Sequence, residues 1–385
     1  MPALYRTTGA VTSEPGNTRA LAGARRLVFA AAVCYHAGTD MPTFSPDQLT
    51  THAQRLLAAS GVPDDEARHI AGSLVLSNLM GHDSHGVTRL PQYLERGGFV
   101  AGVTIEVVRE APASAVVDGK WGYGQTVATQ AMALAIDKAR QASVGVVEVF
   151  NCGHIGRLGE YVETAAASDM IGLVTCNNHG GGLLQVPFGG AEPRMSPNPI
   201  ALGVPTGSEL PIVVDMTSSV VAEGKIKMKR NLGEPMPDGW ALGADGRPIT
   251  DPEQFYGPPR GAILPFGGDS AHKGFALSIL VEVLSGALGG AGYSRDGQTR
   301  WGNGVFMMAI DIAAFIAPDD FKRNTGAFVD WLKSSTLMDG FDEILLPGEP
   351  ETRTRRQREA GGVYVDEPTW QQMNEAAAKL GIELG

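Results

Sequence analysis

The chain has 385 residues, which is too long for one ordinary hydrophobic core, so two domains are expected. Its formal net charge of -11 and pI near 5.2 argue against a nucleic-acid partner or an anionic membrane surface, because both require a concentrated basic face. The three cysteines form no Cys-x-x-Cys pair and no even-numbered secretory framework, and no run of about 18 apolar residues occurs. A cytoplasmic protein without a membrane partner is therefore expected.

The first 40 residues are expected to be an extension without regular structure. Within this extension, Arg25-Arg26 and the apolar stretch after it resemble a short secretory signal. However, Cys34-Tyr35-His36 stands where such a signal needs small residues for cleavage. We therefore do not interpret the extension as an export signal.

Two helices are predicted after this extension. The segment Ser45–Gln48 supplies an N-cap, a proline for the first turn and a glutamine three residues after the cap. Apolar residues then recur at helical spacing until Ser60-Gly61 ends the pattern. A second helix begins at Asp64, within an acidic cluster that suits the positive end of a helix, and leads the chain to Gly81.

The segment Gly81–Arg89 combines an acid/base candidate, a hydroxyl and a permanent cation. If this segment is helical, His85 and Arg89 leave the same face and can reach one ligand. Arg89 offers a fork of donors that matches a carboxylate, Ser84 offers a hydroxyl, and His85 carries a proton that moves near neutral pH. This combination suits a 2-hydroxy or 2-oxo acid, although a structural or capping histidine remains an alternative.

From residue 115 the pattern changes to alternating strands and helices. Strands are predicted over residues 115–119, 144–150, 171–176, 200–204 and 212–215, with helices over 125–142 and 157–168. This order indicates an α/β or α+β domain of roughly 200 residues. The Pro- and Gly-rich stretch 232–260 is expected to be a long ordered loop. Further helices are predicted over 273–287 and 325–334 and from about residue 368.

Several strand ends carry polar side chains. His154 follows a predicted strand and lies between two glycines, which leave room for a ligand, although its ring could simply bond a nearby carbonyl. Asn178 and the segment Asp215–Thr217 end two other strands and could bind a ribose, an amide or a phosphate. Lys273 begins a helix and could meet a phosphate. Helix capping for Asp215 and surface exposure for Lys273 are the alternatives.

The dinucleotide fingerprint Gly-x-Gly-x-x-Gly is absent, because Val127 occupies the third glycine position after Gly122-Tyr123-Gly124. A nicotinamide cofactor would therefore need a non-Rossmann fold. A metal hydrolase using His82, His85, His154 and an aspartate is a rival hypothesis. The His-x-x-His spacing lacks the His-Glu-x-x-His pattern of zinc hydrolases, so no metal is expected.

Seven collinear segments resemble the malate/L-lactate dehydrogenase family that lacks a Rossmann domain, and most of all its hydroxycarboxylate dehydrogenase branch. The segments are Gly81–Pro91, His154–Gly159, Val186–Gly190, Pro197–Pro205, Asp215–Ser219, His272–Leu277 and Leu345–Glu349. The resemblance extends from about Ser45 to the C-terminus.

The resemblance implies an α/β (α+β) fold with two domains. Residues 41–115 and 318–385 would form a helical substrate and dimer domain, and residues 116–317 a non-Rossmann NAD(P)-binding domain with a mixed or antiparallel sheet. It also implies a homodimer that uses NAD or NADP to interconvert 2-hydroxy and 2-oxo acids of the malate, lactate or aryl-lactate type.

The resemblance places Ser84, His85 and Arg89 on substrate and acid/base positions, and His154 on a position that accepts the proton in some members. The implied cofactor contacts are Asn178, Asp215, Met216, Thr217, Lys273, Gly348 and Glu349. We favour His85 as proton donor to the 2-oxo acid, with His154 orienting it or sharing the proton, but the reverse order stays open. Reduction of a cyclic imine carboxylate is the alternative, because the same carboxylate clamp would serve a C=N bond.

Overall fold

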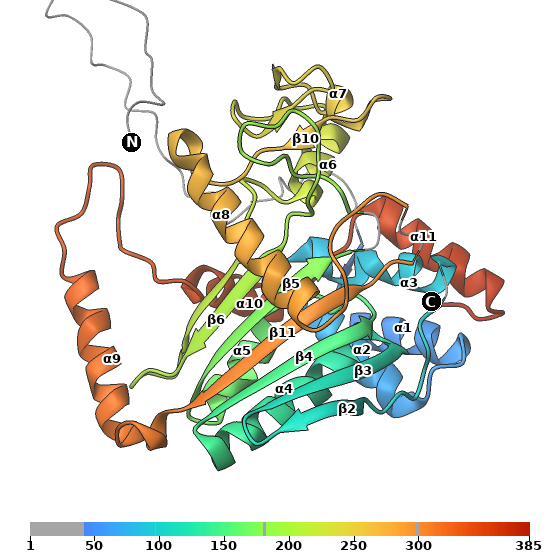
Figure 1. The fold of residues 1–385 in the computed structure, drawn as a ribbon. Helices are drawn as coiled ribbons and strands as arrows, with labels where there is room; N and C mark the ends of the chain where they lie inside the picture. Colours follow the sequence, from blue (N-terminus) through green and yellow to red (C-terminus); the bar gives the residue numbers. More distant parts are fainter. Residues whose placement is uncertain (1–41, 97, 180–181, 298–299) are drawn as a thin grey trace, which may run out of the picture.

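The computed structural model describes residues 42–96, 98–179, 182–297 and 300–385, so the extension predicted for residues 1–40 lies outside the described residues. A mixed seven-stranded sheet occupies the centre (Figure 1), in the order β2-β3-β4-β11-β5-β6-β7. The strands are β2 (Glu106–Ala111), β3 (Ser114–Gly122), β4 (Val144–Cys152), β5 (Met170–Asn178), β6 (Pro199–Val204), β7 (Ile212–Thr217) and β11 (Asn303–Asp311). Within this sheet β3 and β4 pair in parallel, and the other neighbours pair antiparallel.

Helices cover the two faces of this sheet unequally. Helices α4 (Gly124–Ala142) and α5 (Gly159–Ala167) pack on one face and form the larger hydrophobic core with it. The approach is close, because a Cβ atom at Gly145 of β4 would run into the Ala135 carbonyl of α4. Helix α8 (Ala271–Glu282), continued by the π-helical turn η4 (Val283–Leu288), crosses the other face at β5 and β11.

A second core draws on both ends of the described chain. Its elements are α1 (Pro46–Ala59), α2 (Asp64–Leu79), α3 (Leu90–Arg96), α11 (Glu367–Lys379) and the short pair β1 (Thr43–Phe44) with β12 (Val363–Tyr364). The capping box predicted at Ser45 and Gln48 is confirmed, with both reciprocal hydrogen bonds present. Helix α10 (Glu349–Gly361) packs on α2.

Several regions differ from the sequence prediction, including α3, β2 and α10, which were not predicted. The stretch 232–260 is not only loop: α6 (Glu223–Leu232) runs into it, and α7 (Pro252–Tyr256) forms a small core with the three-stranded sheet of β8 (Ala241–Leu242), β9 (Pro248–Ile249) and β10 (Ala262–Ile263). Strand β11, in the middle of the large sheet, was not predicted. It is buried on both faces, so its sequence lacks the polar alternation of a half-exposed strand. Helix α9 (Pro318–Lys333) begins one and a half to two turns before the predicted start at residue 325.

Two helices expose apolar side chains. Helix α9 stands apart from the sheet (Figure 1) and has no buried residue; Phe328 is 54% and Trp331 75% exposed. Helix α8 exposes Ile279 and Leu280. Within the described part of the chain, Gly268–Leu288 is the one helical stretch long and apolar enough to cross a membrane, and part of it packs on the sheet. Such exposed apolar surface is typical of a face that is covered by another protein.

Candidate active site

The Gly81–Arg89 segment is not the single helix assumed from the spacing of His85 and Arg89. It forms two 3₁₀ turns, η1 (Asp83–His85) and η2 (Val87–Arg89), separated by the extended residue Gly86 with φ -88° and ψ -152°. A Cβ atom at Gly86 would collide with the Asn78 side chain, which accepts the Val87 N–H at 2.9 Å. The close contact with α2 therefore breaks the helix.

An ion pair from the C-terminal part of the chain holds this segment. Arg358 of α10 donates to both oxygens of Asp83, at 2.6 and 2.9 Å. The Asn78 amide donates to the same carboxylate at 2.7 Å. Paired donors of this kind fix a carboxylate in position and in plane, so Asp83 anchors the turn rather than reacting.

The three residues predicted on this segment do come together. Ser84 Oγ lies 3.0 Å from His85 Nδ1, and Arg89 Nε donates to the Ser84 carbonyl oxygen at 2.6 Å. Arg89 Nη1 donates to Gln92 Oε1 at 3.0 Å. The hydroxyl, the imidazole and the guanidinium thus share one short stretch of backbone, although not by helical spacing.

His154 joins them from the loop after β4. Its ring stacks on the ring of His85, with centroids 5.5 Å apart and an interplanar angle of 15°. Trp301, just before β11, also stacks on His154 at 5.2 Å and 25°. The two histidines predicted from separate motifs therefore form one pair in the folded chain.

Tyr93 and Gln125 complete the surroundings of His154, and neither was predicted. The Tyr93 hydroxyl lies 2.8 Å from His154 Nδ1, and the Gln125 amide donates to the same hydroxyl at 2.9 Å. Because the buried hydroxyl accepts from Gln125, its own proton goes to Nδ1, which assigns the proton of neutral His154 to Nε2. The sequence signal was available, since Tyr93 follows Arg89 by four residues.

Burial governs the charge of the histidine pair. It lowers the pKa of His85 to about 3 and the pKa of His154 well below its usual value. The Arg89 cation lowers both pKa values further. Without a bound anion, both rings are therefore neutral near pH 7 and suited to accept a proton. A carboxylate beside Arg89 would oppose this effect and favour proton uptake.

Next to the histidine pair, several strands of the large sheet begin or end along one edge, which runs across the strand ends. β4, β5 and β7 end here and β6 begins here, since Pro199 pairs with Thr217 and Ile200 with Thr175. The Asn178 N–H donates to Asn198 Oδ1 at 3.3 Å. Asn178 and Thr217 therefore lie on the same edge as His154. Lys273 is exposed in the first turn of α8.

The other predicted cofactor residues are arranged differently from Asn178 and Thr217. The Asp215 carboxylate accepts the Gly159 N–H at 2.7 Å at the start of α5, so it supports a helix N-terminus. Met216 points to the opposite face of β7 and is 37% exposed. Gly348 and Glu349 lie by the other end of β7, where the Val213 N–H donates to the Pro347 carbonyl.

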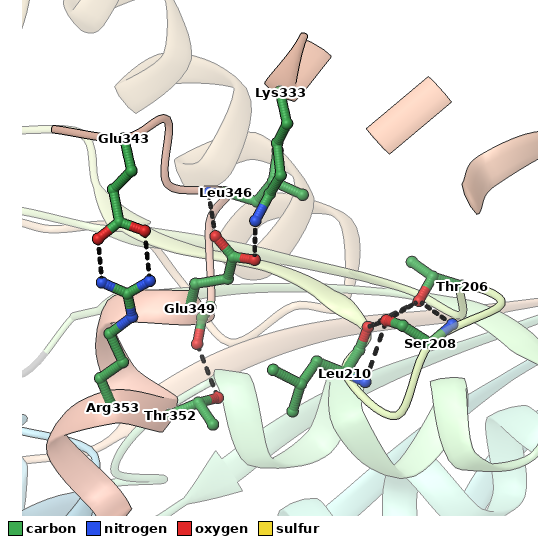
Figure 2. A network of polar contacts seen from close by, with 10 residues as sticks. Thr206, Ser208, Leu210, Lys333, Glu343, Leu346, Glu349, Thr352 and Arg353 are labelled. Carbon is green, nitrogen blue, oxygen red and sulfur yellow. Dashed lines mark hydrogen bonds and ion pairs between the residues drawn. The ribbon is translucent and has the colours of Figure 1, made fainter. Parts of the chain in front are cut away.

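Figure 2 shows the surroundings of Glu349. Its carboxylate pairs with Lys333 of α9 and accepts the Leu346 N–H at 2.9 Å. Nearby, Arg353 donates to both oxygens of Glu343. In the folded chain Glu349 therefore joins α9 to the start of α10.

Comparison with known proteins identifies the family. A model described as malate/L-lactate dehydrogenase matches residues 44–374. The chain belongs to the malate/L-lactate dehydrogenase family. It is an oxidoreductase acting on 2-hydroxy acids. Malate dehydrogenase from Pyrococcus horikoshii is 36% identical over 348 residues, covering 88% of this chain and 95% of the relative.

Two further members bear on the predictions. Hydroxycarboxylate dehydrogenase B from Escherichia coli is 33% identical over 347 residues, covering 88% of this chain and 94% of that enzyme, which confirms the predicted resemblance. The solved structure of delta1-piperideine-2-carboxylate reductase from Pseudomonas syringae superposes with a TM-score of 0.75 at 29% identity. That comparison covers 87% of this chain and all of the reductase.

Proposed function

We propose that the protein catalyses reversible hydride transfer between NAD or NADP and carbon 2 of a 2-hydroxy or 2-oxo carboxylic acid in the cytoplasm. The observation that carries this proposal is the stacked pair of neutral histidines beside Arg89 and Ser84. A permanent cation next to neutral imidazoles suits a substrate with a carboxylate adjacent to an exchangeable hydroxyl proton. When bound, the nicotinamide ring supplies or accepts the hydride.

Each side chain has a proposed task. Arg89 binds the substrate carboxylate, and Ser84 binds a substrate oxygen. His85 exchanges the proton with the 2-hydroxyl or 2-oxo oxygen, because its ring lies beside Ser84 in the same turn and Arg89 is bonded to the backbone of that turn. His154 orients the substrate oxygen through Nε2, since its Nδ1 is bonded to Tyr93.

The residues near Asn178 fit a pyridine nucleotide. His179 is 5% exposed, and its Nε2 has no hydrogen-bond partner among the described residues. A buried polar atom of this kind needs a partner, which a cofactor amide or ribose hydroxyl could provide. We propose that the cofactor is contacted by Asn178, Met216, Thr217 and Lys273. Asp215 supports the site indirectly, through the start of α5. Gly348 and Glu349 contact the part of the cofactor that lies farthest from the histidines, at the other end of β7.

We also propose a homodimer of two-domain subunits. The two hydrophobic cores support a helical domain from residues 41–115 and 318–385 and a cofactor domain from 116–317 whose mixed sheet is not of the Rossmann type. Strand β2 and the first residues of β3 pair within this sheet although they precede residue 116. The exposed apolar side chains of α8 and α9 support a second copy as the partner that covers them.

A panel of 2-oxo acids, assayed with NADH and with NADPH by cofactor absorbance, tests the activity. We expect turnover of at least one malate-, lactate- or aryl-lactate-type acid and a preference for one cofactor. Turnover of cyclic imine carboxylates in preference to every 2-oxo acid would favour the alternative reductase, which the structural similarity to the piperideine-carboxylate enzyme supports. No turnover with either substrate class would overturn the proposal.

A further inference from the structure

Glu282, the last residue of α8, faces the strand ends of the sheet. Its Oε1 accepts the Ser294 N–H and lies 3.3 Å from Asn177 Nδ2. Its Oε2 accepts from Asn198 Nδ2 and lies 3.3 Å from Ser294 Oγ. One carboxylate therefore accepts hydrogen bonds from β5, from the segment before β6 and from the segment after η4 (Figure 1).

One branch of this network reaches Asn178. Asn198 is fully buried, and its Oδ1 accepts the Asn178 N–H at 3.3 Å. Ser294 Oγ lies 3.3 Å from the Asn178 carbonyl oxygen. Both backbone groups of Asn178 are thus bonded by residues that Glu282 holds.

A second branch reaches the loop that carries His154. Asn177 is fully buried, and its carbonyl oxygen accepts from Asn303 Nδ2 at 2.7 Å. Asn303 Oδ1 in turn accepts the Ile155 N–H at 3.0 Å. Ile155 directly follows His154, so the network joins the strand end near the proposed cofactor to the histidine loop.

We propose that Glu282 is a positioning residue for the reaction. It fixes the separation between the Asn178 strand end and the His154 loop, so that the cofactor and the substrate meet in a reactive geometry. This inference rests on the proposed function, because it assumes that Asn178 contacts the cofactor. Glu282 itself touches neither the substrate nor the histidines in this assignment.

A carboxylate is required because the groups around it are donors. Asn177, Asn198 and the Ser294 N–H all present hydrogens, and an ionised glutamate only accepts. In Glu282→Gln, the side-chain NH₂ would face at least one of these buried donors and leave it unpaired. Adding Asn198→Asp reverses the donor and acceptor at one contact and restores a complete network.

The test compares full-length Glu282→Gln, the double variant Glu282→Gln/Asn198→Asp, and Glu375→Gln on the exposed side of α11 as a matched control. The first readout is the Kd of NADH or NADPH, whichever the wild type binds, measured by fluorescence without substrate. kcat, KM and the melting temperature follow. Loss of one buried hydrogen bond predicts about tenfold weaker cofactor binding and about tenfold lower kcat/KM in Glu282→Gln.

Recovery to within about threefold of wild type in the double variant supports positioning, and the control should match wild type. A lower melting temperature with unchanged cofactor Kd and kcat would show a purely structural role and overturn the inference. Failure of the double variant to recover binding would also overturn it. If Glu282→Gln does not fold, the single variant Glu282→Asp, which keeps the acceptors but shortens their reach, is measured instead. Weaker cofactor binding then supports positioning, and a wild-type cofactor Kd and kcat/KM overturn the inference. Absence of wild-type turnover would instead overturn the proposed function, since cofactor binding is measured without substrate.

Discussion

Individual side chains in the site differ in how they are held. His154 is bonded at Nδ1 by a tyrosine that a glutamine fixes in turn, whereas among the described residues His85 Nδ1 contacts the hydroxyl of the neighbouring Ser84. A ring fixed by such a hydrogen-bonded chain is suited to orienting a substrate oxygen, and a ring beside a rotatable hydroxyl is suited to gaining and losing a proton. This contrast supports His85 as the acid/base group.

Substitution of each histidine tests this division. We expect His85→Ala to lower kcat by about 10²- to 10⁴-fold, the usual contribution of a general acid/base, with little change in cofactor Kd. His154→Ala should cost less in kcat and more in substrate KM. Steady-state kinetics with a 2-oxo acid and equilibrium cofactor binding measure both effects. The assignment fails if the two variants lose equal, small amounts of turnover.

The sequence predicted part of this site. Ser84, His85 and Arg89 were recognised because they lie within six residues of each other. The surroundings of His154 were not recognised. Tyr93 and Trp301 contact it from distant parts of the chain, Gln125 acts through Tyr93, and the spacing of Tyr93 from Arg89 does not indicate a contact with His154. The 3₁₀ break was missed for a similar reason, since Asn78 excludes a Cβ atom at Gly86 only in the folded chain.

Among the secondary-structure elements, those with clear periodicity or caps were predicted well, as α1 and α2 show. β11 was missed because it is buried on both faces, so its sequence carries no polar alternation. The element next to it, β4, contains an unexpected carboxyl. Glu148 is 3% exposed, neither oxygen has a hydrogen-bond partner in the described part of the chain, and it lies against Gly289 after η4.

Glu148 gives the folded protein a pH-dependent stability. Burial raises the pKa of Glu148 from 4.5 to about 8. The unfolded chain ionises above its ordinary pKa while the folded chain keeps the proton, so the free energy of unfolding falls between pH 4.5 and about 8 and then levels off. We expect Glu148→Gln to be more stable than wild type at pH 8, by on the order of a few kcal/mol, and to differ little at pH 4.5.

Urea unfolding at the two pH values measures this difference. Glu192→Gln is the matched control, because Glu192 is exposed and pairs with Arg194 at the surface. Its free energy of unfolding should stay within about 1 kcal/mol of wild type at both pH values. A Glu148→Gln variant that shows the wild-type pH dependence would contradict a protonated Glu148.

At the scale of the whole molecule, the described chain leaves apolar surface uncovered. Helix α9 has no buried residue of its own, so covering its apolar side chains is expected to stabilise it in water. The family resemblance predicted a homodimer, but the sequence could not show which surface pairs, since Phe328 and Trp331 look like ordinary core residues at helical spacing.

Trp331→Glu tests the pairing. A charge in the centre of a buried apolar contact costs several kcal/mol, so we expect this variant to shift toward the monomer at micromolar concentration, as measured by analytical ultracentrifugation. Asp330→Asn changes the adjacent exposed position on α9 and should leave the wild-type association state intact. A wild-type protein that sediments as a monomer would overturn the proposed dimer.

The ion pair between Arg358 and Asp83 joins residues 275 positions apart, and β1 pairs with β12 across a longer span still. During synthesis, the last strand of the large sheet, β11, is made about 50 residues before Arg358, the residue that pairs with Asp83 of the Gly81–Arg89 segment. Asn78 can hold the reactive turn early, but the ion pair with Arg358 can form only after translation is nearly finished. A truncated chain that ends before α10 would keep most of the sheet but lack the restraint that shapes its chemistry, so premature termination is expected to yield an inert product.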